Sequence, residues 1–146
     1  MAHYLFNVSD GDRQHAVALL RAKMWGVRRE ERHRDELAPG DLALIYLAAP
    51  TSQFIGRVEA ATAVHDWTPS EAEAYPGDSP SGILLSYTEE WIPPVPMVAV
   101  MHRIDPTATN PLVQANAAAG FQTGVVRITG GEYESVLAVS REARGT

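Results

Sequence analysis

The feature that most restricts the fold is a pair of apolar segments joined by a very short connection. The first runs from Leu42 to Ala48 after a Pro-Gly-Asp turn, and the second spans residues 53–64. Strands joined by so few residues pair antiparallel, because a parallel return needs a crossover of about a dozen residues or more. Gly56, inside the second segment, predicts a bulge or a close approach of another backbone. The chain is therefore expected to be built on an antiparallel pair of strands.

The remaining segments alternate between strand and helix patterns, which predicts an α+β domain. We expect a small, mostly antiparallel β-barrel or curled sheet flanked by helices. The helix that starts near Arg13 should end at Gly26, and the strand that starts near Ile83 should break at its proline cluster and form a sheet edge there. The expected strands are 3–9, 25–27, 42–48, 53–64, 83–97 and 124–129, and the expected helices are 13–24, 69–74, 110–120 and 130–143.

Length and composition are those of a single soluble domain, residues 1–146. Apolar residues make up 45% of the chain, enough for a core, and there is no cysteine, which excludes disulfides and thiolate metal sites. The first residues lack the basic and apolar regions of a signal peptide, and no apolar run approaches the ~20 residues that span a bilayer. We expect a cytoplasmic monomer with no membrane partner.

Charge is distributed unevenly along the chain. The net charge is −6, which argues against broad, non-specific binding of nucleic acid. Yet six of the 12 Lys and Arg residues fall between Arg21 and Arg34, whereas residues 35–90 contain ten acids and a single Arg. A local basic face is therefore expected on an otherwise acidic protein.

Patterns for catalysis or for a bound cofactor are absent. The chain contains no G-x-S-x-G elbow, no P-loop and no dinucleotide-binding fingerprint. Its histidines do not form an H-x-x-x-H or H-E-x-x-H pair, so no metal site is expected. We therefore expect no enzyme and no cofactor. The five histidines are His3, His15, His33, His65 and His102.

A binding site is better supported, by the stretch "MWGVRRE" of residues 24–30. Trp25 follows an amphipathic helix and precedes Gly26, where a ligand can approach the backbone closely. The arginines come directly after. An aromatic ring beside several cations suits a nucleobase and its flanking phosphates, since stacking on an aromatic side chain contributes about 1–3 kcal/mol per base. The alternative from the same residues is a core tryptophan followed by a solvated charged face.

The order of three segments resembles the EVE domain, a PUA-like relative of the YTH and ASCH domains. The segments are "YLFNVS", then "WGVRREERHRDELAPGDLALIY", then "FIGRVEAATAV", and the resemblance covers nearly the whole chain. It implies a small, mostly antiparallel barrel-like sheet flanked by helices. It also implies recognition of a modified base, above all a modified cytosine in DNA, as the YTH domains hold a methylated adenine of RNA in an aromatic cage.

The resemblance also implies a set of site residues. Asn7 and Ser9 would offer hydrogen bonds to a base edge, Trp25 would stack on the base, and Gly26 and Val27 would supply backbone beside it. The loop before the last strand would form another wall, with Gln122 reading the base edge. That wall comprises Phe121, Gln122, Thr123 and Gly124. A second aromatic residue would come from the long loop, as Trp67 or Tyr75. The phosphate contacts would be Arg28, Arg29 and Arg32.

Four alternatives to a reader of modified DNA stay open from the sequence. One is a PUA-like module that binds tRNA or rRNA. Another is a protein that binds a small molecule or a free nucleobase, which the acidic loop of residues 65–82 favours because it repels phosphate. The third is an enzyme that acts on nucleobases, which would need a general acid or base in the pocket, with an Asp or His of the long loop as the one candidate. The fourth is an adaptor whose basic segment docks an acidic protein. The expected partner is nucleic acid, most simply modified DNA and otherwise RNA.

Overall fold

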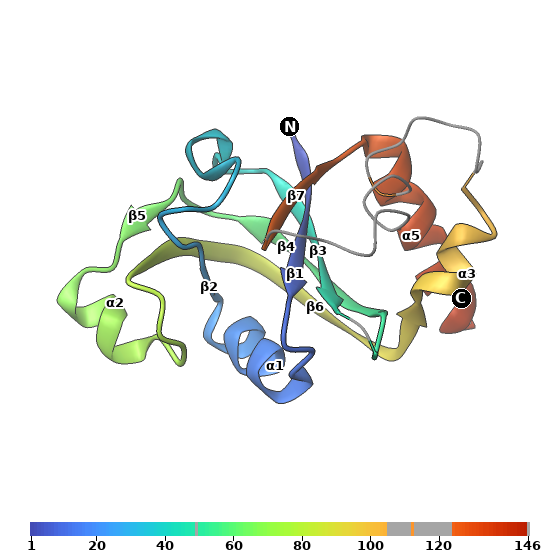
Figure 1. Ribbon diagram of the computed structural model, residues 1–146, viewed down its shortest axis with the longest axis horizontal. Helices are drawn as coiled ribbons and strands as arrows, with labels where there is room; N and C mark the ends of the chain where they lie inside the picture. Colours follow the sequence, from blue (N-terminus) through green and yellow to red (C-terminus); the bar gives the residue numbers. More distant parts are fainter. Residues whose placement is uncertain (49, 105–111, 113–123, 146) are drawn as a thin grey trace.

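The computed structural model describes residues 1–48, 50–104, 112 and 124–145. Within them a curled sheet runs through the middle of the molecule, with α1 against one side and α3 and α5 gathered at one end (Figure 1). The strands are β1 (His3–Val8), β2 (Met24–Gly26), β3 (Leu42–Leu47), β4 (Gln53–Ala60), β5 (His65–Asp66), β6 (Ser81–Pro96) and β7 (Val125–Ile128). The helices are α1 (Arg13–Ala22), η1 (Arg34–Glu36), α2 (Pro69–Ala74), α3 (Met97–Met101) and α5 (Gly130–Ala143).

The sheet has the strand order β2-β6-β4-β3-β1-β7, and β5 pairs with β6. The predicted hairpin is confirmed, since β3 and β4 pair antiparallel. The sheet is mostly antiparallel, as expected, and β1 pairs with β3 in parallel. The close approach predicted at Gly56 is also confirmed. A Cβ atom there would lie 2.1 Å from the carbonyl oxygen of Glu89 on β6, so only glycine fits.

Two expectations about where elements end are wrong. Helix α1 ends at Ala22, because Lys23 takes the left-handed conformation (φ 57°) and its N–H caps the helix carbonyls. Gly26 instead lies in β2. Strand β6 does not break at its prolines but continues to Pro96. It can do so because Phe54 pairs with Val95 and Gly56 with Glu90, so Pro93 and Pro94 lie in an irregular stretch where no ladder N–H is required. Pro96, in register with Gln53, is the last residue of the strand.

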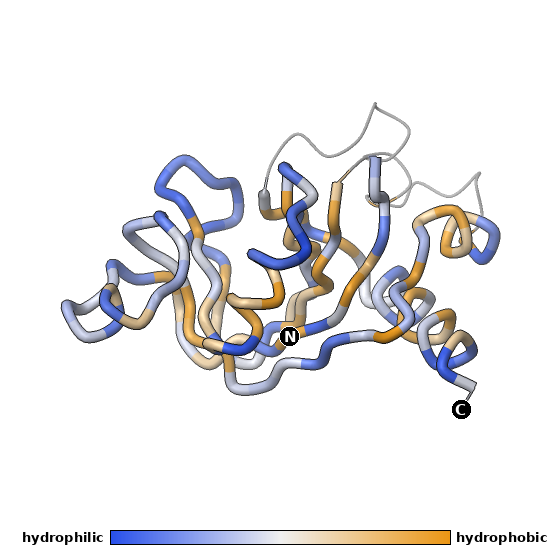
Figure 2. Tube along the Cα trace, turned by 90° about the horizontal axis from the view of Figure 1, so that it is seen from below, coloured by the Kyte–Doolittle hydropathy of each residue, from blue (hydrophilic) through white to orange (hydrophobic). Residues whose placement is uncertain are grey.

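Both faces of the sheet are buried. On one face β1, β3 and β4 pack with α1 and β2 around Phe6, Leu20 and Ile45. On the other face the same strands pack against α3 and α5 around Leu44, Trp91 and Val136. Apolar residues therefore follow one another along the strands, and polar residues concentrate in the connecting loops (Figure 2). The helices at 69–74 and 130–143 have the predicted bounds, and the helix predicted at 110–120 lies outside the described residues apart from Leu112.

A polar cluster around Glu89 holds β4, β6 and the end of α5 together. The carboxylate of Glu89 accepts hydrogen bonds from Tyr87 (2.6 Å), from the Trp91 indole (2.7 Å) and from Arg57 (3.2 Å). Arg144, just beyond α5, donates a further bond at 3.1 Å. Burial raises the pKa of Glu89, but the hydrogen bonds from Tyr87, Trp91 and Arg57 outweigh burial and hold its pKa at about 2. The ionised carboxylate is thus favoured in the folded state.

Replacing Glu89 by Gln is expected to lower the free energy of unfolding near neutral pH by about 2 kcal/mol, because hydrogen bonds to a charged group contribute roughly 1.5–3 kcal/mol. Because the pKa of Glu89 is lower in the folded state, its carboxylate stabilises the fold at pH values above the unfolded pKa of 4.5. This stabilisation is lost as the pH falls towards about 2. Urea unfolding over a pH series measures both effects, with the exposed Glu134→Gln as control. A difference between wild type and E89Q that stayed constant down the series would contradict the assignment.

Candidate functional site

A cleft of about 890 Å³ opens beside the carboxyl end of β1. Its walls come from the end of β1, the start of α1, β2 and the loop that follows it, the loop after α2, and the start of β7. Ligand sites in proteins commonly have volumes of about 300–1,000 Å³, so the space suits a nucleobase with part of its sugar. Seven of the residues predicted for the site line it: Asn7, Ser9, Trp25, Gly26, Arg28, Tyr75 and Gly124.

The cleft lies at the seam of the curled sheet. β1 and β2 are separated in the sheet by β3, β4 and β6, yet Phe6 of β1 stacks on Trp25 of β2, with ring centroids 5.5 Å apart and an interplanar angle of 16°. The sheet must curl for these two strands to meet. On the far side of β1, the N–H of Asn7 donates to the carbonyl oxygen of Gly124 at 2.8 Å. The cleft therefore forms where two ends of one sheet come face to face.

Among the described residues, Trp25 and Tyr75 are the large aromatic side chains of the cleft lining. Trp25 is 6% exposed, and its stacking on Phe6 fixes the orientation of its ring. Tyr75 lies over Gly26, since a Cβ atom on Gly26 would be 2.1 Å from the Tyr75 hydroxyl. Trp67 packs behind Tyr75 at a centroid distance of 5.0 Å and donates its indole N–H to the carbonyl oxygen of Ser79 at 2.9 Å. Of the two aromatic residues expected from the long loop, Tyr75 borders the cleft and Trp67 supports it.

The hydroxyl of Tyr75 stays protonated in this setting. Burial raises its pKa above the ordinary value of 10.0, and the neighbouring charge of Asp78 raises it further. Arg28 and a backbone hydrogen bond from Gly26 act in the opposite direction but are weaker. At physiological pH Tyr75 therefore presents a neutral ring and a hydroxyl that can both donate and accept a hydrogen bond.

A short helix and an ion pair hold the loop that carries Tyr75. Thr68 caps α2 in a capping box: its hydroxyl accepts the N–H of Glu71, and its own N–H donates to the Glu71 carboxylate. His65 contacts the Glu71 carboxylate at 3.0 Å. The backbone carbonyl of Ala63 raises the pKa of His65, and the Glu71 carboxylate raises it further. These contacts fix the far wall of the cleft to the end of β5.

The predicted phosphate-contact residues lie on the loop after β2. Arg28 pairs with Asp78 at 3.0 Å and Arg29 with Asp66 at 3.5 Å, both exposed to solvent. Arg32 is exposed and does not line the cleft. The acidic loop is thus adjacent to the basic loop and neutralises part of it. Such exposed pairs contribute little, at most about 1 kcal/mol, so a phosphate could displace the carboxylates.

Several predicted site residues are placed elsewhere or are not described. Phe121, Gln122 and Thr123 lie outside the described residues. Val27 is buried and does not line the cleft. Its N–H donates to the carbonyl oxygen of Ser81 at 2.9 Å, and its own carbonyl accepts from the Ser81 hydroxyl at 2.6 Å.

The sequence-based interpretation missed several residues of the lining, above all Glu31. Its two carboxylate oxygens lie 3.1 and 3.3 Å from the backbone nitrogen of Gly124, which donates to them. His15 and Leu19 reach the cleft from α1. Residues 28–32 are all charged and of mixed sign, which is the pattern of an exposed loop, and nothing local shows which of these side chains turns inward.

Other functional features are absent from the described part of the chain. No group of three or more His, Asp or Glu residues is arranged there to hold a metal ion. Among the helices that are described, none has the length and apolar character needed to cross a membrane.

Solved structures with the same fold fix the fold class. The chain matches human THYN1, solved in complex with 5-methylcytosine-containing DNA, with a TM-score of 0.64 and 14% identity over 96% of this chain and 98% of that one. It matches the MmI1 YTH domain with a TM-score of 0.62 and 11% identity, over 97% of each chain. It matches a mutant form of the ZmASCH protein of Zymomonas mobilis with a TM-score of 0.55 and 13% identity, over 94% of this chain and 95% of that one.

The chain has a PUA-like fold. The fold implied by the resemblance to EVE, YTH and ASCH domains is thereby confirmed. In sequence, no family model matches the chain, and no curated protein is similar to it. In this PUA-like sheet the cleft lies where β1 and β2 come together.

The contact between Gly26 and Tyr75 predicts a coupled pair of substitutions. Gly26→Ala should lower the free energy of unfolding by about 1–3 kcal/mol, because its Cβ must displace Tyr75 or Ser79. In a Tyr75→Phe background the clash with the hydroxyl is gone and the cost should fall, with a coupling of roughly 0.5 kcal/mol or more. Chemical unfolding of the four variants measures this coupling.

Gly131→Ala is the matched control, since its nearest neighbour beyond the helix would be 3.8 Å away and the substitution should be nearly neutral. Equal costs of G26A in the two backgrounds would mean that Tyr75 does not occupy the space over Gly26.

Proposed function

We propose that this protein is a non-enzymatic reader of a modified base in nucleic acid, with a modified cytosine in DNA as the first candidate ligand. A flipped or unpaired base would enter the cleft at the sheet seam. The observation that carries the proposal is the cleft itself, which combines two aromatic side chains, a close-approach glycine and a polar strand end in one space. The structural likeness to THYN1 bound to methylcytosine DNA and to a YTH domain supports it.

Each residue of the proposed site has a physical role. Trp25 would contact one side of the base, and the ring of Tyr75 would contact the other side or its sugar. Asn7 would offer hydrogen bonds to the base edge, since a side-chain amide can both donate and accept. Ser9 and the backbone of Gly26 and Gly124 would add further polar contacts. Trp25, Tyr75 and Asn7 come from separate segments of the chain. They can hold a base together only if the seam between these segments keeps its shape.

Phosphates would lie at the edge of the cleft, on Arg28, and outside it, on Arg29 and Arg32. Three such contacts on a single strand imply a modest salt dependence, with log K falling by roughly two for each tenfold rise in salt. Unstacking a base from a duplex costs a few kcal/mol, so single-stranded or mismatched targets should bind more tightly than paired ones. A single added methyl group contributes only about 0.8 kcal/mol by burial, so preference for the methylated base should be small unless a clash rejects the plain one.

A second candidate is a protein that binds a free nucleobase or nucleoside. The cleft lining favours it, because it includes five acidic residues, Asp10, Asp12, Glu30, Glu31 and Asp78, and a single arginine among the described residues. Negative charge in the cleft repels phosphate and leaves a neutral base as the acceptable ligand. The two functions differ in whether a flanking sugar-phosphate chain adds affinity.

Tyr75→Leu is expected to weaken binding of a single-stranded oligonucleotide containing 5-methylcytosine by about tenfold, since a lost base–aromatic contact costs roughly 1–3 kcal/mol. Fluorescence anisotropy of labelled strands measures this. Tyr87→Leu, an exposed tyrosine on β6 away from the cleft, should leave the affinity unchanged.

Competition with the free nucleoside separates the two candidates. A nucleoside that displaces the strand at a similar concentration would favour the small-molecule function. Equal affinity of Tyr75→Leu and wild type, or no binding of any strand or nucleoside, would refute a base site in this cleft.

A further inference from the structure

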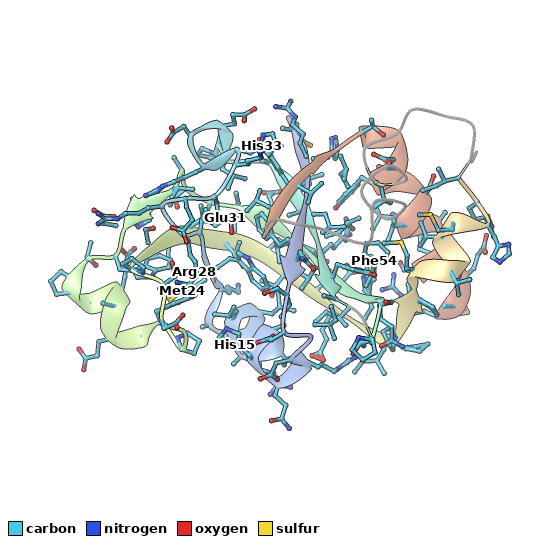
Figure 3. The ribbon with its side chains drawn as sticks, in the orientation of Figure 1. His15, Met24, Arg28, Glu31, His33 and Phe54 are labelled. Atoms are coloured by element: carbon cyan, nitrogen blue, oxygen red, sulfur yellow. The ribbon has the colours of Figure 1, made fainter. Side chains whose placement is uncertain are left out.

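The carboxylate of Glu31 is placed as part of the cleft wall. It comes from the loop after β2, and both of its oxygens accept the N–H of Gly124 at the start of β7. The contact bridges 93 residues of sequence across the seam. Figure 3 shows Glu31 and Arg28 on the same loop and His15 on α1, and all three residues line the cleft. The contact therefore holds a negatively charged acceptor at one defined position of the cleft.

This carboxylate retains capacity to accept further hydrogen bonds. An ionised carboxyl group has about four lone-pair sites, and one backbone N–H uses only a part of them. Within the described residues Glu31 forms no ion pair, and Arg28, the arginine of the cleft lining, pairs with Asp78. A ligand that offers an N–H at this position would meet an acceptor already fixed in place.

The surrounding charge determines what kind of group fits. Asp10, Asp12, Glu30 and Asp78 also line the cleft, against Arg28 as the arginine of the lining, so an anionic group is unfavourable there. A carbonyl oxygen directed at Glu31 would face another acceptor with no proton between them. An amino group directed at Glu31 would form a charge-assisted hydrogen bond, the pairing by which carboxylates recognise the amino group of cytosine.

We propose that Glu31 is a specificity-determining residue that selects a base with an exocyclic amino group and rejects a base with a carbonyl at the same position. The proposal rests on the proposed function of the cleft and adds the chemical class of the base. It predicts that bases of the cytosine and adenine type bind more tightly than bases of the thymine and uracil type.

Two single strands that differ at one base test the proposal. One carries 5-methylcytosine and the other thymine, which share the methyl group and differ in the amino or carbonyl group and in the ring nitrogen beside it. Wild type is expected to bind the 5-methylcytosine strand at least about tenfold more tightly, a factor equal to roughly 1.4 kcal/mol. Glu31→Gln can offer either a donor or an acceptor, so the preference should fall to about threefold or less.

The ratio of the two affinities is the readout, because it cancels the general gain in affinity that follows from removing a negative charge. Glu134→Gln, which changes the same charge on an exposed position of α5, should retain the wild-type ratio. Equal binding of the two strands by wild type overturns the proposal without any variant, whereas the assignment of the preference to Glu31 needs a folded Glu31→Gln, which circular dichroism checks.

The outcomes separate the two levels of the proposal. If wild type binds both strands equally, or if Glu31→Gln keeps the full preference, Glu31 does not select the base, and the cleft remains a base site as long as Tyr75→Leu weakens both strands. If neither strand binds, both the selection by Glu31 and the proposed function are overturned.

Discussion

The curling of the sheet, which brings Phe6 of β1 onto Trp25 of β2, is the constraint on which the rest of the structure depends. These strands lie at opposite sides of β3, β4 and β6, so their contact is possible only if the sheet curves back on itself. Stacking of two buried aromatic rings contributes about 0.5–1.5 kcal/mol beyond the area they bury. The cleft is a consequence of this closure, because the strands that meet at the seam leave an open space beyond the end of β1.

The sheet supports the cleft from its opposite face. Buried residues on both sides of β1, β3 and β4 leave no freedom for these strands to slip, since a shift of one residue would exchange the two faces. The Glu89 cluster fixes β6 to β4 and to the end of α5. A rigid scaffold of this kind is what a binding site needs, because a site that varies in shape loses affinity to the entropy of ordering it.

Much of the scaffold follows from local sequence patterns, whereas the cleft lining follows from contacts between distant segments. The short connection after Ala48 predicts the β3–β4 pair, and Gly56 predicts the close approach of β6. Trp25 could be proposed because an aromatic beside a glycine and several arginines is visible in sequence, and Asn7 because the resemblance to EVE domains implies it. Glu31 could not, since its partner Gly124 lies 93 residues away. Lys23 ends α1 in a left-handed conformation that glycine usually adopts. The prediction that the helix ends at Gly26, the nearest glycine in the sequence, was therefore wrong.

The central claim is that a base binds in the seam between β1, β2 and β7, and amide NMR spectra of the protein titrated with a short single strand containing 5-methylcytosine test it most directly. The account predicts shifts that saturate together at the amides of Asn7, Gly26, Tyr75 and Gly124, with the residues around Glu89 unchanged. Shifts confined to the exposed arginines of the loop after β2, or to the face formed by β6 and α5, would contradict it.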